Sequence, residues 1–160
     1  GGYQMLGQTL DDPTGSESGR PQTLRGLGLL PTRTVFSEQK RRAQVKATVA
    51  APFAGAALTG YQIHTGRTEV QGLPFCTQAD GHPEGCVQGD VFGTYLHGVF
   101  DAPEAALRTA QALAKKKGVT LTGEALDTHA YKEQQYDKLA DSVRKSLDME
   151  WIYRIMEGKA

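Results

Sequence analysis

Histidine and cysteine side chains are the first candidates for chemistry in this sequence of 160 residues. In chain order they are His64, Cys76, His82, Cys86, His97 and His129. Structural zinc sites need close pairs of such ligands, and zinc proteases use a helical His-Glu-x-x-His motif. Neither spacing occurs here, so the sequence predicts no metal site.

Motifs for phosphate binding and for a serine nucleophile are incomplete. Gly26-x-Gly28 lacks the third glycine of a dinucleotide fingerprint, and no Gly-Lys-Ser/Thr sequence occurs. Residues 15–19 read Gly-Ser-Glu-Ser-Gly, which has the form of a serine elbow. No apolar strand leads into this polar segment, however, as such an elbow requires. Nucleotide-binding loops and serine hydrolases are therefore excluded.

His97 follows directly on a mostly apolar run, residues 91–96. Such a run is typical of a central strand that is buried on both faces. In parallel α/β sheets, functional side chains gather beyond the carboxyl ends of the strands. The sequence therefore places His97 at a strand end where chemistry is expected, although a structural histidine is the alternative.

The elements predicted around His97 alternate between strands and helices. Short apolar or β-branched runs predict strands at residues 27–36, 44–50, 59–70 and 91–96. Periodic apolar residues and end signals predict helices at residues 2–10, 103–117 and 128–156. The basic residues 40–42 are expected in a solvated turn. The alternation predicts an α/β domain with layers of helices on a mostly parallel sheet.

Composition excludes several classes of partner. The chain has 18 basic and 18 acidic residues and 39% hydrophobic residues, which fits one domain with a real core but no positive field for nucleic acid. Residues 47–58, the longest nearly apolar stretch, are too short to span a membrane, and no signal peptide is seen. Two scattered cysteines favour free thiols and a cytoplasmic location.

Four sequence blocks in the same order resemble class I glutamine amidotransferases of the cobyric acid synthase type. Residues 1–7, Gly-Gly-Tyr-Gln-Met-Leu-Gly, resemble the segment after the catalytic cysteine. Residues 60–68 are similar to a Gly-Tyr-Glu-x-His-x-Gly-Arg-Thr signature, with Gln62 in place of the glutamate. Residues 93–100 resemble the Gly-Thr-Tyr-x-His-Gly block around the catalytic histidine, and residues 136–141 match the tail.

The resemblance implies a mechanism and a set of site residues. A cysteine thiolate attacks the side-chain amide of glutamine while a histidine, here His97, relays protons. Gly1 would offer its N–H to the oxyanion, and Gln4 would contact the substrate. Arg67 is expected to bind the substrate carboxylate, with an ordinary exposed arginine as the alternative. His64 either lines the same pocket or has a structural role.

Two departures from the usual family pattern accompany this resemblance. The nucleophile precedes the residue that matches Gly1, so the chain as printed is expected to be inactive in glutamine hydrolysis. Class I enzymes usually orient the histidine with a glutamate two residues later, where this chain has Val99. Cobyric acid synthases also depart from the triad in this respect.

The resemblance further implies the context of the domain. Residues 1–160 would form the C-terminal portion of a single flavodoxin-like glutamine amidotransferase domain that lacks its first strands. The intact enzyme would use ATP and Mg²⁺ in an upstream synthetase domain and amidate adenosylcobyrinic acid a,c-diamide, a corrinoid, with ammonia from glutamine. No cofactor is expected in this chain. The alternatives are an amidotransferase subunit that acts on another carboxylate, such as a peptidoglycan precursor, and a non-catalytic glutaminase-like module.

Overall fold

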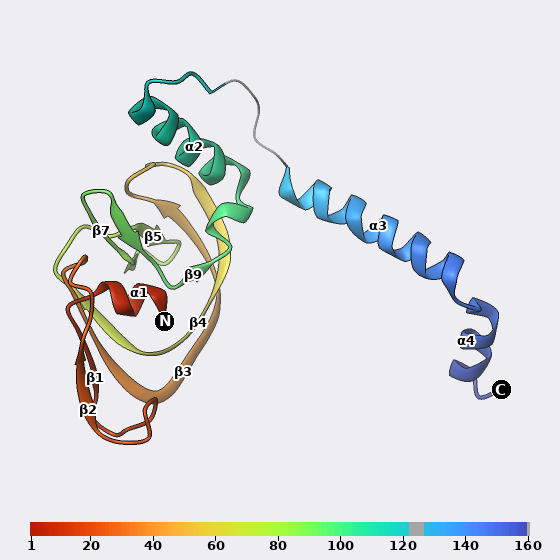
Figure 1. Ribbon diagram of the computed structural model, residues 1–160, viewed down its shortest axis with the longest axis horizontal. Coiled ribbons are helices and arrows are strands. Elements are labelled where there is room, and N and C mark those ends of the chain that lie inside the picture. The colour runs from red at the N-terminus through yellow and green to blue at the C-terminus, as the bar shows by residue number, and fades with distance from the viewer. Residues whose placement is uncertain (122–126, 160) are drawn as a thin grey trace. The chain divides into compact units, whose positions relative to one another are not determined.

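A computed structural model describes residues 1–121 and 127–159 of the chain (Figure 1). Its internal contacts divide the chain into two compact units, Gly1–Ala125 and Leu126–Ala160. Each unit has its own secondary structure, and the residues that carry the chemical motifs at 1–7, 60–68 and 93–100 all belong to the first unit.

The first unit combines short helices with a sheet. Its elements in chain order are α1 (Gly2–Leu6), β1 (Thr9–Asp12), β2 (Gln22–Arg25), β3 (Thr32–Val49), β4 (Ala57–Val70), β5 (Cys76–Gln78), β6 (Pro83–Glu84), β7 (Cys86–Gln88), β8 (Val91–Gly93), β9 (Leu96–His97), the 3₁₀ helix η1 (Val99–Asp101) and α2 (Pro103–Lys117). The predicted α/β fold class is confirmed. Strand β2 was not predicted, because its polar sequence carries little alternation.

The sheet is mixed. Its main path runs β2-β1-β3-β4-β9, β5 pairs with β3 and β6, and β7 and β8 form a separate pair. Among the described strands only β1 and β3 are parallel, so parallel pairing is less extensive than the sequence predicts. The reason is connection length: a parallel neighbour needs a crossover of a dozen or more residues, and most strands here are joined by short turns.

Strands β3 and β4 form one long hairpin that curves around α1 (Figure 1). They pair from Thr32↔Val70 to Thr48↔Ala57, with a register shift between Val35 and Lys40. Strand β4 confirms the prediction for residues 59–70. The strands predicted at residues 27–36 and 44–50 overlap β3, but the turn predicted between them is wrong, because the basic residues 40–42 lie within the same strand and are exposed there.

The core fills the space beside this hairpin. Phe75 is fully buried, with its ring stacked on Phe92 at 5.2 Å between centroids and Phe53 edge-on at 5.9 Å. Leu58 and Leu96 are also buried in this cluster. Burying such a side chain stabilises the fold by about 1.5–3 kcal/mol. Since successive side chains of a strand point to opposite faces, an inward Leu96 turns the next residue, His97, outward.

The ends of α1 and α2 explain one confirmed helix prediction and one wrong one. Helix α2 spans the predicted residues 103–117 and ends at Gly118, whose φ of 68° is left-handed. Helix α1 ends at Gly7, so the predicted helix over residues 2–10 is too long. The predicted buried strand at 91–96 is wrong, because the chain forms two short strands there, β8 and β9.

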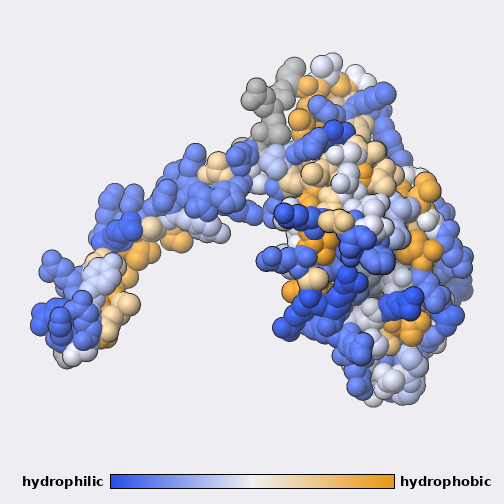
Figure 2. Space-filling view, turned by 180° about the vertical axis from the view of Figure 1, so that it is seen from behind, coloured by the Kyte–Doolittle hydropathy of each residue, from blue (hydrophilic) through white to orange (hydrophobic). Residues whose placement is uncertain are grey.

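The second unit contains two helices, α3 (Thr128–Ser146) and α4 (Met149–Met156). The predicted single helix over residues 128–156 is wrong, because Asp148 accepts a hydrogen bond from the Trp151 N–H at 2.9 Å and begins a new helix. Apolar side chains gather along one side of these helices (Figure 2). No helix within the described ranges is long and apolar enough to cross a bilayer.

Candidate active site

His97 lies at the end of β9, at the edge of the sheet. Its backbone is opposite Tyr61 of β4, and its exposed imidazole stacks on the Tyr61 ring at 4.8 Å between centroids with an interplanar angle of 7°. Gly60 permits this approach, because a Cβ there would lie 2.1 Å from the His97 carbonyl oxygen. Gly98 then turns the chain into η1 with a φ of 86°. The imidazole is therefore fixed by neighbours on β4.

Four of the five predicted site residues line one cavity of about 500 Å³, namely Gly1, Gln4, His64 and His97. Gly1 and His97, which are 96 positions apart in the sequence, thus line the same cavity. A proton-accepting imidazole and the first turn of α1 therefore share one space with room for a small substrate.

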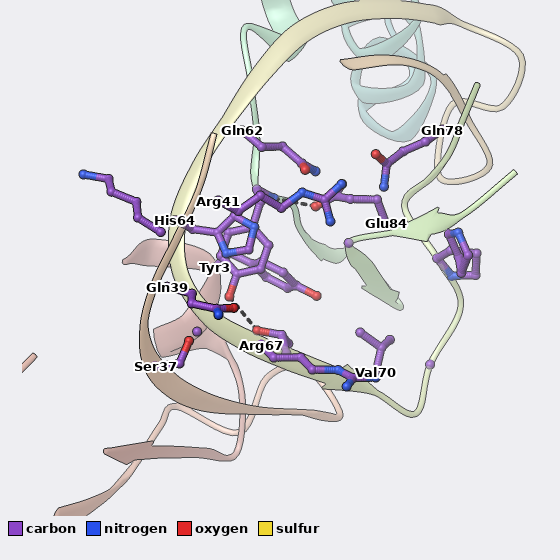
Figure 3. Close-up of a pocket in the computed structure, with 18 residues that line it drawn as sticks. Tyr3, Ser37, Gln39, Arg41, Gln62, His64, Arg67, Val70, Gln78 and Glu84 are labelled. Atoms are coloured by element: carbon purple, nitrogen blue, oxygen red, sulfur yellow. Dashed lines mark hydrogen bonds between the residues drawn. The ribbon is translucent and has the colours of Figure 1, made fainter. Parts of the chain in front are cut away.

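Arg67 lines a different cavity of about 600 Å³ beside the first (Figure 3). Arg41, Gln62 and Glu84 lie around this second cavity, and Tyr3 forms part of the wall of both. The buried side-chain oxygens of Tyr3 and Gln62 have no hydrogen-bond partner in the structure. Arg67 and His97 therefore line different cavities, although these cavities share walls made by Tyr3, His64 and Tyr95.

Gln4 is buried in α1 and connects this helix to β4. Its side-chain Nε2 donates a hydrogen bond to the Thr65 carbonyl oxygen at 3.1 Å. The Gly1 carbonyl oxygen accepts from the Met5 N–H at 3.0 Å, which closes the first helical turn. These bonds hold the beginning of α1 against the strand that also carries His64.

His64 packs its ring against Tyr95, with 3.7 Å between ring centroids and an angle of 11°. Burial, followed by the nearby charge of Arg41, lowers the pKa of His64. Its Nδ1 atom is buried without a hydrogen-bond partner in the structure. His64 is therefore uncharged at neutral pH and forms an aromatic wall shared by the two cavities.

A buried carboxylate that the sequence analysis missed, Glu84, fixes the segment before His97. It accepts hydrogen bonds from the Tyr95 N–H at 2.7 Å and from the Thr94 hydroxyl at 2.5 Å. The Thr94 oxygen in turn accepts from the Leu96 N–H at 2.9 Å. No motif marks Glu84, because only the fold brings β6 beside residues 94–96.

The two cysteines are free thiols, as predicted, and both are fully buried. Burial and then the charge of Glu84 raise the pKa of Cys76 to about 12, and burial also raises the pKa of Cys86. Neither cysteine lines the cavity around His97. Thiols of this kind are poor nucleophiles at neutral pH.

Two charged residues that were not predicted also face the cavity around His97. Lys40 follows the register shift in β3 and is opposite Thr65 of β4. The Thr65 hydroxyl donates a hydrogen bond to the carboxylate of Glu17, which comes from the loop after β1. Within residues 1–121 and 127–159, no group of three or more His, Cys, Asp or Glu side chains is arranged to hold a metal ion.

Comparison with known proteins identifies the class to which this fold and site belong. The CobB/CobQ-like glutamine amidotransferase domain matches residues 1–105, which include α1, the β3–β4 hairpin and His97. The chain belongs to this family of glutamine amidotransferase domains.

Similar curated proteins are cobyric acid synthases. That of Thermoanaerobacter sp. (strain X514) is 39% identical over 98% of this chain and 34% of its own length. Those of Streptococcus sanguinis (strain SK36) and Citrobacter koseri (strain ATCC BAA-895 / CDC 4225-83 / SGSC4696) are each 42% identical over 98% of this chain and 32% and 33% of their own lengths. The chain thus spans about one third of the length of these relatives.

Proposed function

We propose that this chain is the C-terminal portion of the glutamine amidotransferase domain of a cobyric acid synthase and that it takes part in releasing ammonia from glutamine. The observation that carries the proposal is the meeting of Gly1 and His97 at one cavity. In the family pattern the nucleophilic cysteine precedes the residue that matches Gly1. His97, which lines the same cavity as Gly1, is then the proposed proton acceptor.

The chemistry that this arrangement supports is amide hydrolysis through a thioester. His97 takes the proton of the cysteine thiol, and the thiolate adds to the side-chain amide carbon of glutamine. The backbone N–H of Gly1 stabilises the resulting oxyanion. His97 then gives the proton to the departing ammonia, and water hydrolyses the thioester to release glutamate.

The proposed roles of the predicted residues follow their places. His97 is the catalytic acid and base, Gln4 positions α1 and the substrate side chain, and the neutral ring of His64 closes one wall. Arg67 reaches substrate glutamine only if the substrate extends into the neighbouring cavity.

The remaining parts of the proposed reaction belong to the longer protein. The released ammonia would be used by an ATP- and Mg²⁺-dependent synthetase domain to amidate carboxylates of adenosylcobyrinic acid a,c-diamide. The identity of the curated relatives over nearly the whole chain supports this assignment. An amidotransferase that serves another carboxylate, or a non-catalytic module of the same fold, would share the fold of residues 1–105 but not this corrinoid reaction.

The test is His97→Ala in the full-length parent enzyme. We expect loss of glutamine-dependent amidation and glutamine hydrolysis, while amidation supported by ammonium salts remains. His82→Ala is the matched control, because His82 is exposed and lines neither cavity. Loss of both activities would contradict the assigned role of His97, and unchanged glutamine hydrolysis would do so as well.

The residue that precedes Gly1 in the parent protein distinguishes the enzyme from a non-catalytic module. A Gly-x-Cys sequence directly upstream supports the glutaminase. Any other residue in the position of the cysteine favours the module, because neither Cys76 nor Cys86 lines the cavity around His97.

A further inference from the structure

The charges around the cavity that holds His97 are few and of opposite sign. Among the described residues that line it, Glu17 supplies the only carboxylate and Lys40 the only lysine or arginine side chain. The other walls are histidines, neutral polar residues and apolar residues. A free α-amino acid carries one ammonium and one carboxylate group, and this pair of side chains has the complementary charges.

Lys40 lies directly after a register shift in the β3–β4 hairpin. The register of β3 and β4 shifts between Val35 and Lys40, so that Lys40 is opposite Thr65 while Val35 is opposite Arg67. Gly66 lies at this irregularity with a φ of 81°, and a Cβ there would be 2.7 Å from the Val35 carbonyl oxygen. Irregularities of strand pairing such as β-bulges redirect side chains and recur beside active sites.

Thr65 is next to both charged residues and to helix α1. Its hydroxyl donates to Glu17, its carbonyl oxygen accepts from Gln4, and its backbone is opposite Lys40. One residue of β4 therefore connects an acid, a base and the first turn of α1, all of which face the same cavity as His97.

Asp12, a buried residue at the end of β1, holds the loop that carries Glu17 in place. Its carboxylate accepts hydrogen bonds from the backbone N–H groups of Ser16, Glu17 and Ser18 at 2.9–3.1 Å. The hydroxyl groups of Ser16 and Ser18 also donate to it. A loop held by five such bonds presents its acidic side chain in a preorganised position.

We propose that Glu17 and Lys40 form a clamp for the α-amino acid end of the substrate, with Glu17 binding the α-ammonium group and Lys40 the α-carboxylate. The clamp makes the site specific for free glutamine, as opposed to simple amides or glutamine side chains within peptides. This inference rests on the proposed glutaminase function and names the residues that select its substrate.

The test measures kcat/KM of the full-length parent enzyme for three amides. L-glutamine carries both charges, 5-amino-5-oxopentanoate lacks the ammonium group, and 4-aminobutanamide lacks the carboxylate. We expect Glu17→Gln to lower kcat/KM for L-glutamine by about tenfold to a hundredfold, since hydrogen bonds to charged groups have this strength. Its kcat/KM for 5-amino-5-oxopentanoate should stay unchanged. Lys40→Met should show the mirror pattern, with 4-aminobutanamide unaffected.

Matched controls are Glu69→Gln and Lys46→Met, which remove an exposed charge of the same kind from β4 and β3 outside the cavity. Equal loss with all three amides would overturn the clamp, because it would mean that Glu17 only supports Thr65. Unchanged specificity in either variant would also overturn it.

If the wild-type parent enzyme hydrolyses no glutamine at all, the proposed glutaminase function is refuted, and kinetics cannot test the clamp. Calorimetric binding of the same three compounds then decides the clamp on its own. Weaker binding of L-glutamine by Glu17→Gln, with unchanged binding of 5-amino-5-oxopentanoate, would support it, and equal binding of L-glutamine by the wild type and this variant would overturn it.

Discussion

The carboxylate of Glu84 accepts a hydrogen bond from the backbone N–H of Tyr95 at 2.7 Å, two residues before His97. Glu84 is 7% exposed, and it is held between β5 and the segment that leads into β9. The Thr94 hydroxyl donates to the same carboxylate and accepts from the Leu96 N–H. The backbone on the N-terminal side of His97 is thus attached to a buried charge rather than free at the sheet edge.

Glu84→Gln should therefore loosen β9 and slow catalysis. In this variant an amide NH₂ group replaces one carboxylate oxygen. Either the Thr94 hydroxyl or the Tyr95 N–H then faces another donor and loses its acceptor. We expect the free energy of unfolding to fall by about 1–3 kcal/mol and kcat for glutamine hydrolysis to fall with it. Urea denaturation and steady-state kinetics measure the two effects. Glu69→Gln on exposed β4 is the control, and unchanged stability of Glu84→Gln would contradict this role.

Gly66→Ala should destabilise the fold more than Gly81→Ala. Both glycines have a φ above 80°, and such a backbone costs a non-glycine residue about 1–2 kcal/mol. A Cβ at Gly81 would meet no atom within 4 Å, whereas at Gly66 it would lie 2.7 Å from the Val35 carbonyl oxygen. We expect an additional loss of about 1 kcal/mol or more for Gly66→Ala. Equal urea midpoints for the two variants would exclude this close contact.

The sequence predicted the parts of the fold that depend on local signals. Pro103 at the start and Gly118 at the end delimit α2, and both act through their own backbone geometry. The alternation of Tyr61 and Ile63 with polar residues identified β4 as a strand, although Tyr61 and Ile63 are exposed and Gln62 between them is buried. His97 and Gln4 were singled out by their sequence blocks, and the cavity contains both.

The parts that the sequence could not give depend on neighbours in space. Residues 40–42 were expected in a solvated turn because three basic residues in a neutral protein form no charged patch, yet β4 pairs with all three. Asp148 stops α3 by capping α4, although the apolar period continues across it. Glu17 and Glu84 became site residues only through contacts with Thr65 and Tyr95, which are 48 and 11 positions away.

Cys76 should resist alkylation in the folded protein. Burial and the neighbouring carboxylate of Glu84 raise the pKa of Cys76 to about 12, so very little of this thiol is ionised at pH 8. We expect mass spectrometry after iodoacetamide treatment to find Cys76 and Cys86 unmodified. Full modification of both in guanidinium chloride is the control. Rapid labelling of native Cys76 would show that its burial is wrong.

Asp12→Asn should remove part of the acid sensitivity of the fold. Burial raises the pKa of Asp12, but the hydrogen bonds from Ser18, Glu17 and Ser16 outweigh it and hold the pKa below the ordinary value. A carboxylate with a lowered folded pKa stabilises the protein above the unfolded pKa of about 3.9 and loses this effect as the pH falls through the folded pKa. The wild type should therefore lose stability below about pH 4.

The variant should be less stable than the wild type at pH 7, with a flatter decline in acid. Urea denaturation between pH 7 and pH 2.5 measures this difference, and Glu69→Gln should keep the wild-type slope. Because Asp12 also accepts from the Glu17 N–H, Asp12→Asn should raise KM for glutamine in the parent enzyme as well. A variant with the wild-type pH slope would mean that the loop after β1 is held without the charge of Asp12.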